Sequence, residues 1–458
     1  MFSLHETTRK RTCRTAFFAL CLAPTCATAA WIADHHLPWR DAAAAGRLSD
    51  RYHLEVTLDD LQEPRPNMTR LAGVTLAEPG VAAPLMKLTG VVTHRRGDAL
   101  VLAIEEVALA AADLPALAAR CEWLLGRTPA AKIELRIERA TLAASDGAPA
   151  VTLHQLRGAI ERNGDAPPRL QAIAHLTENP NPDAKPIGLT YELAAKPSAV
   201  DAEAHQETEA AEPATQQRIV TFNTQQNAIP VALLAPVVPG MAALNNAATF
   251  TGVVTWRASD AGELHGRLAS VDLAGVLPAD SPHKLTGTAT LELTDCQWHG
   301  ERLQRLAGTL AATDAQANDS FLAAAHGYLA CRPVESLLPT LAAAQRLAEQ
   351  RRAGQELSPE DAAMLDAMHL LSHLACRFTL NAAGLVIEQH IPAASTLPAD
   401  TLAAIDGQAV LLCPRPADGK ILPGVAWLQF IASPHPPGQW LPYTPEALET
   451  ASRLPPPP

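Results

Sequence analysis

The histidines of this chain are the first residues to test for chemistry, because imidazole binds metals and transfers protons. His369 and His373 lie four residues apart in a segment, 359–374, whose apolar spacing predicts a helix. Two histidines at this spacing share one helix face and could bind zinc together. Glu360 and Asp366 are nearby, but the spacing supplies no further ligand. We therefore expect both histidines to be core or boundary residues.

Two pairs of neighbouring carboxylates, Asp59–Asp60 and Glu105–Glu106, are the second candidate for chemistry. Two close carboxyl groups can divide acid and base roles between them. Both pairs fall in strand-like sequence, where adjacent side chains point to opposite faces of a sheet. We therefore expect neither pair to share a proton. The adjacent His35 and His36 follow an apolar leader, and we expect no metal site there.

Motifs typical of common enzyme classes are absent from the chain. It has no Gly-x-Ser-x-Gly elbow, no Gly-x-x-x-x-Gly-Lys-Ser/Thr loop, no Gly-x-Gly-x-x-Gly and no His-Glu-x-x-His. Cys-x-x-Cys does not occur. Three of the eight cysteines lie in the N-terminal 34 residues and the other five are widely spaced, so most should be small buried residues. We predict no catalytic, cofactor-binding or metal-binding residue, and we expect a protein that is not an enzyme.

Composition excludes several classes of protein. The 458 residues are 48% apolar and 18% charged, with a formal charge of -12. The length predicts two or three units or one elongated body, and the apolar fraction excludes a wholly disordered chain. Acidity without a basic tract excludes nucleic acid as the main partner. Only 4% of the residues are aromatic, which is unusual for sugar-binding sites.

Residues 1–34 have the pattern of an export leader. An uncharged apolar run, 16–33, follows four basic residues, Arg9, Lys10, Arg11 and Arg14. This order keeps the basic cluster in the cytoplasm and delivers the body outside. One outcome is a signal-anchor, which gives a single-pass inner-membrane protein with a periplasmic body. The others are cleavage near Ala29, which gives a soluble periplasmic protein, and a buried helix in a cytosolic protein.

The body that follows alternates between apolar and polar residues as strands do. The clearest case is Lys132–Glu138, where Ile133, Leu135 and Ile137 fall on one face. We expect further strands at 100–104, 154–160, 170–176, 187–193, 219–223, 250–256, 263–268, 285–293 and 303–310, and a hairpin of 378–380 with 385–389. We expect helices at 114–125, 321–330, 337–351 and 359–374, and a short one within 230–240. Ser358 and Pro359 have the pattern of a helix start.

These elements predict a division of the body into two β-rich units. The first covers residues 50–195 and the second covers 218–392. Between them, 196–217 carries five carboxylates and almost no bulky apolar residue, which is typical of an acidic linker or long loop. The remaining residues, 393–458, read as an extended Pro-rich tail.

A short pattern recurs in both units. Leu88–Thr93 reads LTGVVT, Phe250–Thr255 reads FTGVVT and Leu285–Thr290 reads LTGTAT. A glycine inside a strand permits a bulge or close backbone approach. Recurrence predicts a repetitive β architecture built from similar strand pairs, with coincidence in β-rich sequence as the alternative.

Several runs of the second unit follow one another in a recognisable order: IVTFNTQQNAIPVALLAP at 219–236, FTGVVTW at 250–256, GRLASVDLAGVLP at 266–278, and the strand-like 285–293 and 303–310. They resemble the C-terminal half of the AsmA-like (AsmA/TamB-type) bacterial envelope proteins. The resemblance implies a mainly β fold with helical insertions: an elongated, curled antiparallel sheet behind an N-terminal membrane helix. It also implies an apolar groove, and it carries no catalytic residue.

The leading hypothesis is thus a non-enzymatic periplasmic protein, anchored in the inner membrane, that handles lipid or supports envelope assembly. Its expected partners are membrane lipid or other envelope proteins, without a cofactor. One alternative is an exported β-scaffold that binds other proteins without transferring lipid. The other is an exported hydrolase whose site is assembled only by the fold. Inward-facing aliphatic residues suit an open groove and a filled core equally, so the sequence leaves that choice open.

Overall fold

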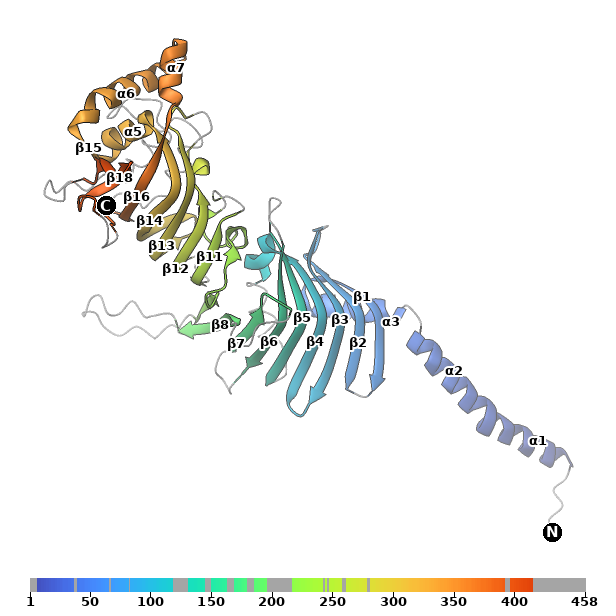
Figure 1. Cartoon of the computed structure of the whole chain (residues 1–458). Helices are drawn as coiled ribbons and strands as arrows, with labels where there is room; N and C mark the ends of the chain where they lie inside the picture. Colours follow the sequence, from blue (N-terminus) through green and yellow to red (C-terminus); the bar gives the residue numbers. More distant parts are fainter. Residues whose placement is uncertain are drawn as a thin grey trace, which may run out of the picture.

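The computed structural model describes residues 6–36, 39–65, 67–81, 83–117, 131–144, 150–162, 169–178, 185–195, 216–241, 244, 247–257, 261–277, 281–391 and 396–414. The protein is mainly β, with 53% of the described residues in strands of one large, unclosed sheet. Figure 1 shows an elongated molecule in which the N-terminal helix projects from one end of the sheet. Three helices gather at the other end. This architecture confirms the predicted fold class.

A long helix begins the described chain. It consists of α1 (Glu6–Phe17), a π-helical turn (Phe18–Leu22) and α2 (Ala23–His36). Within it, Thr8–Ile32 is long and apolar enough to cross a membrane, and none of it is buried against the body. Its uncharged part, residues 15–32, extends about 27 Å, which is close to the roughly 30 Å of a hydrocarbon core. A signal sequence has the same properties, so anchor and cleaved leader both fit this helix.

Helix α3 (Trp39–Tyr52) covers the start of the sheet and was not predicted from the sequence. Ala44, Ala45 and Leu48 pack against the cluster of buried residues that contains Val56 and Leu58. The backbone N–H of Val56 donates to the Ser49 hydroxyl at 3.0 Å, which fixes the turn from helix to strand. The apolar residues of α3 do gather on one face, which is a usable helix signal, although alanine makes up most of that face.

The first nine strands follow one another across the sheet: β1 (Glu55–Arg65), β2 (Met68–Ala77), β3 (Pro84–Arg96), β4 (Ala99–Ala110), β5 (Lys132–Ala143), β6 (Val151–Glu161), β7 (Arg169–His175), β8 (Ile187–Ala195) and β9 (Gln216–Asn223). Neighbours are antiparallel except β4 and β5, which are parallel over eleven residue pairs. The residues between them start with a 3-10 turn, Ala111–Asp113, and 114–117 are helical. A parallel pair needs such a crossover, so the sheet is mixed and not purely antiparallel. The rest of the helix predicted at 114–125 lies outside the described residues.

The sheet continues without a break into the second half. Strand β9 pairs with both β8 and β11 (Thr249–Arg257). The strands β12 (Ala261–Asp272), β13 (Leu285–His299), β14 (Arg302–Asn318), β16 (Met368–Asn381) and β17 (Gly384–Gln389) then follow. Three short strands add to β16: β15 (Arg332–Pro333), β18 (Thr401–Ile405) and β19 (Gln408–Leu412). The acidic segment therefore connects two paired strands, and its residues 216–217 belong to β9, whereas 196–215 lie outside the described residues.

Helices interrupt the second half where the sequence predicts two of them. These are α5 (Asp319–Leu329) and α6 (Leu338–Arg352), after a 3-10 turn at Glu335–Leu337. Short 3-10 turns also occur at Val231–Leu233 and Leu273–Val276. The short helix expected within 230–240 is such a turn following β10 (Ile229–Pro230), because prolines bracket it and leave no room for regular hydrogen bonding.

The predicted helix 359–374 is the main correction. It begins as expected, since the Ser358 hydroxyl accepts from the Asp361 N–H at 3.1 Å and Pro359 follows. However, α7 (Pro359–Asp366) ends after eight residues and β16 starts at Met368. The apolar residues at 364, 368, 371 and 374 fit a helical period by accident of spacing. Pairing of β16 with β14, over nine residue pairs, outweighs that local preference.

The region predicted as an extended tail, 393–458, begins with a hairpin. Strands β18 and β19 turn at Asp406–Gly407, where both residues have positive φ angles. An Asp-Gly pair between short apolar runs is a strong hairpin signal, and the Pro-rich composition of the rest obscured it. Residues 415–458 lie outside the described part of the chain.

Three hydrophobic clusters follow one another along the sheet. The first joins α3 to β1–β5, the second joins the segment after β10 to β11–β13, and the third surrounds α5. Leu153 contacts the first two clusters, and Leu291, Leu303 and Leu306 contact the last two. One face of the sheet is therefore covered by separate pieces of chain instead of by a second sheet.

Candidate functional site

An apolar cavity of about 160 Å³ lies where two of these covering pieces meet. It is bounded by β5–β9, β11, the residue Leu114 of the crossover, and the segment 229–237. All of its lining residues are hydrocarbon or aromatic: Leu114, Leu142, Val151, Leu153, Leu156, Ala172, Ile173, Ala174, Ile187, Leu189, Phe222, Ile229, Leu233, Leu234, Val237 and Trp256.

Strand alternation places these side chains on the covered face, except that of Ile173, which has the parity of Gln171, is 48% exposed and also lines a depression on the other face. In β7 and β8, Ala172 pairs with Leu189 and Ala174 pairs with Ile187. Residues one position away, such as Thr190, point to the opposite face. The alanines of β7 are small, so the cavity lies over this strand.

The segment 229–237 covers one side of the cavity. The Val231 N–H donates to the carbonyl of Ala248 at 3.0 Å, and the Leu234 N–H donates to that of Val231 at 2.8 Å. The turn before it is fixed by Thr224, whose hydroxyl accepts from the Gly252 N–H at 2.9 Å. The cover is therefore bonded to the sheet by its backbone, and its side chains are free to face the cavity.

The cavity can bind hydrocarbon but cannot perform acid–base chemistry. None of its lining residues titrates or carries a charge. A dry cavity of about 150 Å³ admits a benzene molecule, so this one has room for a short piece of an acyl chain. Polar groups would be desolvated there without a hydrogen-bond partner, which costs roughly 1–3 kcal/mol for each group.

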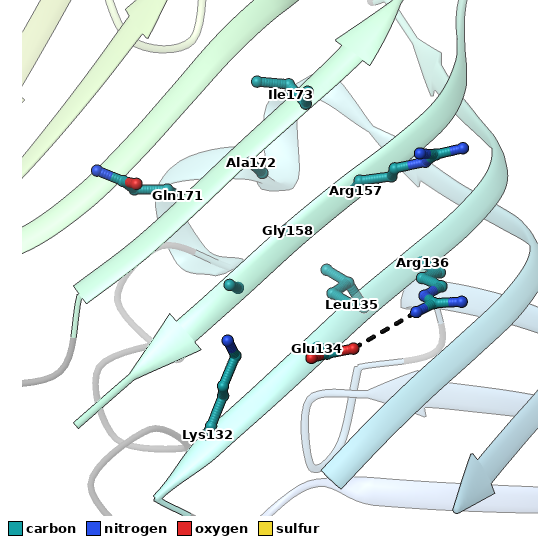
Figure 2. A pocket seen from close by; sticks show the side chains of 10 residues that line it. Lys132, Glu134, Leu135, Arg136, Arg157, Gly158, Gln171, Ala172 and Ile173 are labelled. Carbon is teal, nitrogen blue, oxygen red and sulfur yellow. Dashed lines mark hydrogen bonds and ion pairs between the residues drawn. The ribbon is translucent and has the colours of Figure 1, made fainter. Parts of the chain in front are cut away.

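A wider, shallow depression of about 380 Å³ lies on the opposite face of β5–β7. Figure 2 shows Lys132, Arg136 and Arg157 around it, with Glu134 beside Arg136. The Arg136–Glu134 ion pair is 3.4 Å long, and Lys132 pairs with Glu161 at 3.2 Å. Exposed pairs of this kind are worth about 0–1 kcal/mol. The depression is therefore a solvated polar surface, and the sheet is apolar on one face and charged on the other.

The histidines singled out by their spacing lie on a strand and not on a helix. His369 Nε2 lies 3.2 Å from a carboxylate oxygen of Asp319, without the geometry of a hydrogen bond. Burial lowers the pKa of His373, and His390 lowers it further. Among the described residues, no group of three or more His, Cys, Asp or Glu side chains is arranged to hold a metal ion. The two histidines therefore have different neighbours, Asp319 for His369 and His390 for His373.

The carboxylate pairs also separate in the structure. Asp60 accepts a hydrogen bond from the Gln62 amide at 2.7 Å, while Asp59 lies against Gly73 in the neighbouring strand. Glu105 lies over Gly90. Each carboxylate thus has its own surroundings.

One buried polar group was missed by sequence reasoning, because its members come from residues far apart in the chain. His283 Nδ1 lies 2.5 Å from the Ser320 hydroxyl, and His283 Nε2 lies 2.6 Å from an Arg352 guanidinium nitrogen. Since guanidinium can only donate, Nε2 accepts and Nδ1 carries the proton that is donated to Ser320. Burial, followed by the charge of Arg352, lowers the pKa of His283 to about 3.

This arrangement is the reverse of an activated serine. A histidine base must accept the serine proton, whereas His283 donates to Ser320. Ser320 is fully buried, so no substrate reaches it. The group therefore fixes the start of α5 to the end of α6 and does not form a hydrolase site.

Comparison with known proteins gives no match for this chain among family models, curated proteins or solved structures.

Proposed function

We propose that this protein is an AsmA-like envelope protein, anchored in the inner membrane by its N-terminal helix, whose periplasmic body holds lipid acyl chains. The observation that carries the proposal is the cavity on the covered face of β5–β9, which is lined only by apolar side chains. The exposed N-terminal helix, with its uncharged apolar run, supplies the route to the membrane.

The edge of the sheet favours lipid handling over a β-scaffold that adds strands from a partner. Among the described strands β1 pairs only with β2, so its other side is an edge in that part of the chain. The exposed side chains of β1 are charged or polar over much of its length, and it contains Pro64. Charges and proline at an edge disfavour pairing with a further strand.

The first experiment is lipid analysis of the full-length chain. The protein is solubilised from membranes in detergent, purified and analysed by native mass spectrometry. We expect copurified phospholipid or another acyl lipid in about equimolar amount. Recovery of the uncleaved chain in the soluble fraction without bound lipid contradicts the proposal.

A cavity-filling variant tests where lipid binds. Ala174→Phe places a ring into the cavity from β7, so retained lipid should fall at least fivefold. Thr190→Phe adds the same bulk on the other face of the neighbouring strand and should retain lipid as the wild type does. Circular dichroism and thermal unfolding establish that both variants fold. Equal lipid content in two folded variants excludes this cavity as the binding site.

A further inference from the structure

Two buried cysteines meet in the C-terminal core. Cys331 immediately precedes β15, and Cys413 immediately follows β19. Both thiols are buried in the cluster around α5, and Cys376 of β16 packs against the same cluster. Residues 331 and 413 are far apart in sequence, so only the fold brings them to one place.

The register of β15 and β19 places these two cysteines opposite each other. Arg332 pairs with Leu412 and Pro333 pairs with Leu411 in an antiparallel ladder. One step further, the same register pairs Cys331 with Cys413. Side chains at directly opposed positions of antiparallel strands point to the same face, and here both point into the core.

The hydrogen bonds of this ladder show whether Cys331 and Cys413 form a hydrogen-bonded or a non-hydrogen-bonded pair. The Val334 N–H donates to the Val410 carbonyl at 3.2 Å, and hydrogen-bonded pairs alternate with non-bonded ones along the ladder. Two steps on, Arg332–Leu412 is again of the bonded kind, and Cys331–Cys413 is of the non-bonded kind. In agreement, the Cys331 N–H donates to Ala325 and the Cys413 N–H to Asp400. Non-bonded pairs have Cα atoms about 4.5 Å apart, within the range that a disulfide spans.

We infer that Cys331 and Cys413 form a disulfide when this chain folds in an oxidising compartment. The oxidant is an external disulfide, such as oxidised glutathione or the disulfide of a thiol oxidase. One cysteine thiolate attacks it and releases a thiol, and the second cysteine then attacks the mixed disulfide and releases another. The pair loses two electrons and two protons, and the oxidant becomes two thiols. The inference goes beyond the proposed lipid function, and its physiological setting rests on the export proposed with it.

The bond must form before the core closes. Burial raises the pKa of Cys331 well above its usual range and raises that of Cys413 to about 12. Thiolate is the reacting species, so the thiols of the folded chain react slowly with oxidant and with alkylating reagents. Once formed, the disulfide would be equally protected from reduction.

The third cysteine is a poorer partner. Cys376 pairs with Leu310 on one side and with Gln389 on the other, so no cysteine lies opposite it in the ladder. Cys296 belongs to a different hydrophobic cluster. Both should remain thiols, and they serve as internal controls.

Peptide mapping tests the inference without reference to export or lipid. The full-length chain is denatured and reduced, then refolded in detergent with a glutathione redox buffer; free thiols are then alkylated in denaturant. Trypsin places the four cysteines of the body's described residues, 296, 331, 376 and 413, on different peptides. We expect one linked pair, Cys331 with Cys413, and alkylated Cys296 and Cys376. Alkylated Cys331 and Cys413 in the refolded chain, or linkage of either to Cys376, overturns the inference.

Stability gives a second readout. The oxidised chain should unfold at a temperature about 5 °C or more above that of the reduced chain, because the crosslink closes a loop of about 80 residues. Cys413→Ser should abolish this difference, and Cys376→Ser should preserve it. Lipid content is measured in parallel, so loss of lipid binding and absence of the disulfide are separate outcomes. An unchanged unfolding temperature in a chain with the mapped linkage contradicts the structural role of the bond.

Discussion

His283 shows how a buried neutral residue makes the stability of this protein depend on pH. It accepts from Arg352 and donates to Ser320, and its pKa in the fold is about 3 against 6.5 for an exposed histidine. The fold therefore excludes a proton that the unfolded chain binds readily. Above pH 6.5 neither state carries the proton, and the full stability remains. As the pH falls from 6.5 towards 3, the unfolded state takes up the proton and stability is lost.

This gives a prediction at the scale of a single residue. Each pH unit below 6.5 should cost about 1.4 kcal/mol through His283. Urea unfolding of the wild type should therefore show a loss of about 2 kcal/mol from pH 7 to pH 5, beyond that of His283→Gln. Glutamine retains an acceptor for Arg352 but does not titrate. Equal pH dependence in the two proteins would show that His283 takes up its proton in the folded chain as readily as in the unfolded chain.

Single residues also show what sequence can and cannot predict. The alternation in Lys132–Glu138 correctly placed Ile133 and Ile137 in the core, because the burial of a strand residue follows from its parity. The contacts among His283, Ser320 and Arg352 have no local pattern, since each residue comes from a different element. We expected no zinc site at His369 and His373 because the sequence supplies no further ligand. That expectation assumed that the two histidines share a helix, whereas both lie on strand β16.

At the scale of elements, the recurring Thr-Gly pattern marks places where strands approach closely. Gly252 of β11 lies directly opposite Gly266 of β12, and the ring of Phe250 packs over both. A Cβ atom at Gly252 would lie 2.2 Å from the His265 carbonyl oxygen and 2.6 Å from Gly266 Cα. These are backbone atoms, which cannot move aside as a flexible side chain would.

We therefore predict that Gly252→Ala destabilises the protein by about 1–3 kcal/mol in urea unfolding. Gly188→Ala is a matched control within a strand, because no atom lies within 4 Å of the position that its added Cβ would occupy. The control should change stability by about 0.5 kcal/mol or less. If both variants lose the same free energy of unfolding, these glycines matter for the backbone conformation of the strand. The close approach of the two strands would then not be their role.

Elements with strong local signals were predicted, and those fixed by distant partners were not. The capped start of α7 and the hairpin of β16 with β17 follow from short-range patterns, Ser358-Pro359 and Asn381–Gly384. The end of α7 depends on β14, and the parallel pairing of β4 with β5 depends on the path of the crossover. No window of sequence contains both partners of such contacts.

At the scale of the whole molecule, the leader helix and α3 have different roles although they adjoin. The leader is exposed along its length, whereas α3 packs on β1 and is tied to it by the Arg40–Glu63 ion pair at 2.6 Å. Removing the first leaves the sheet covered. Removing both exposes Leu54, Val56 and Leu58.

Two truncations test this difference. The chain beginning at residue 37 should be soluble and fold cooperatively, while the full chain should partition into membranes. The chain beginning at residue 53 should aggregate or unfold at least 5 °C lower, because its first strands lose their cover. Membrane partition of the chain that begins at residue 37 would show that the body itself binds the bilayer. Equal melting of the two truncated chains would show that α3 contributes nothing to the fold.

The pairing of β8 with β9 bears on whether the chain must be continuous between these two strands. Eight residue pairs join these strands, and Tyr191 and Val220 pack together across them, although residues 196–215 separate them in sequence. The ladder and its side chains therefore hold the two strands together in addition to the covalent connection, whose contribution is to keep them at a high effective concentration. Two separately synthesised fragments, ending and starting within 196–215, would retain every contact described at this junction. We therefore expect two such fragments to assemble when they are mixed, and we expect an inserted reporter domain in this segment to leave the sheet intact.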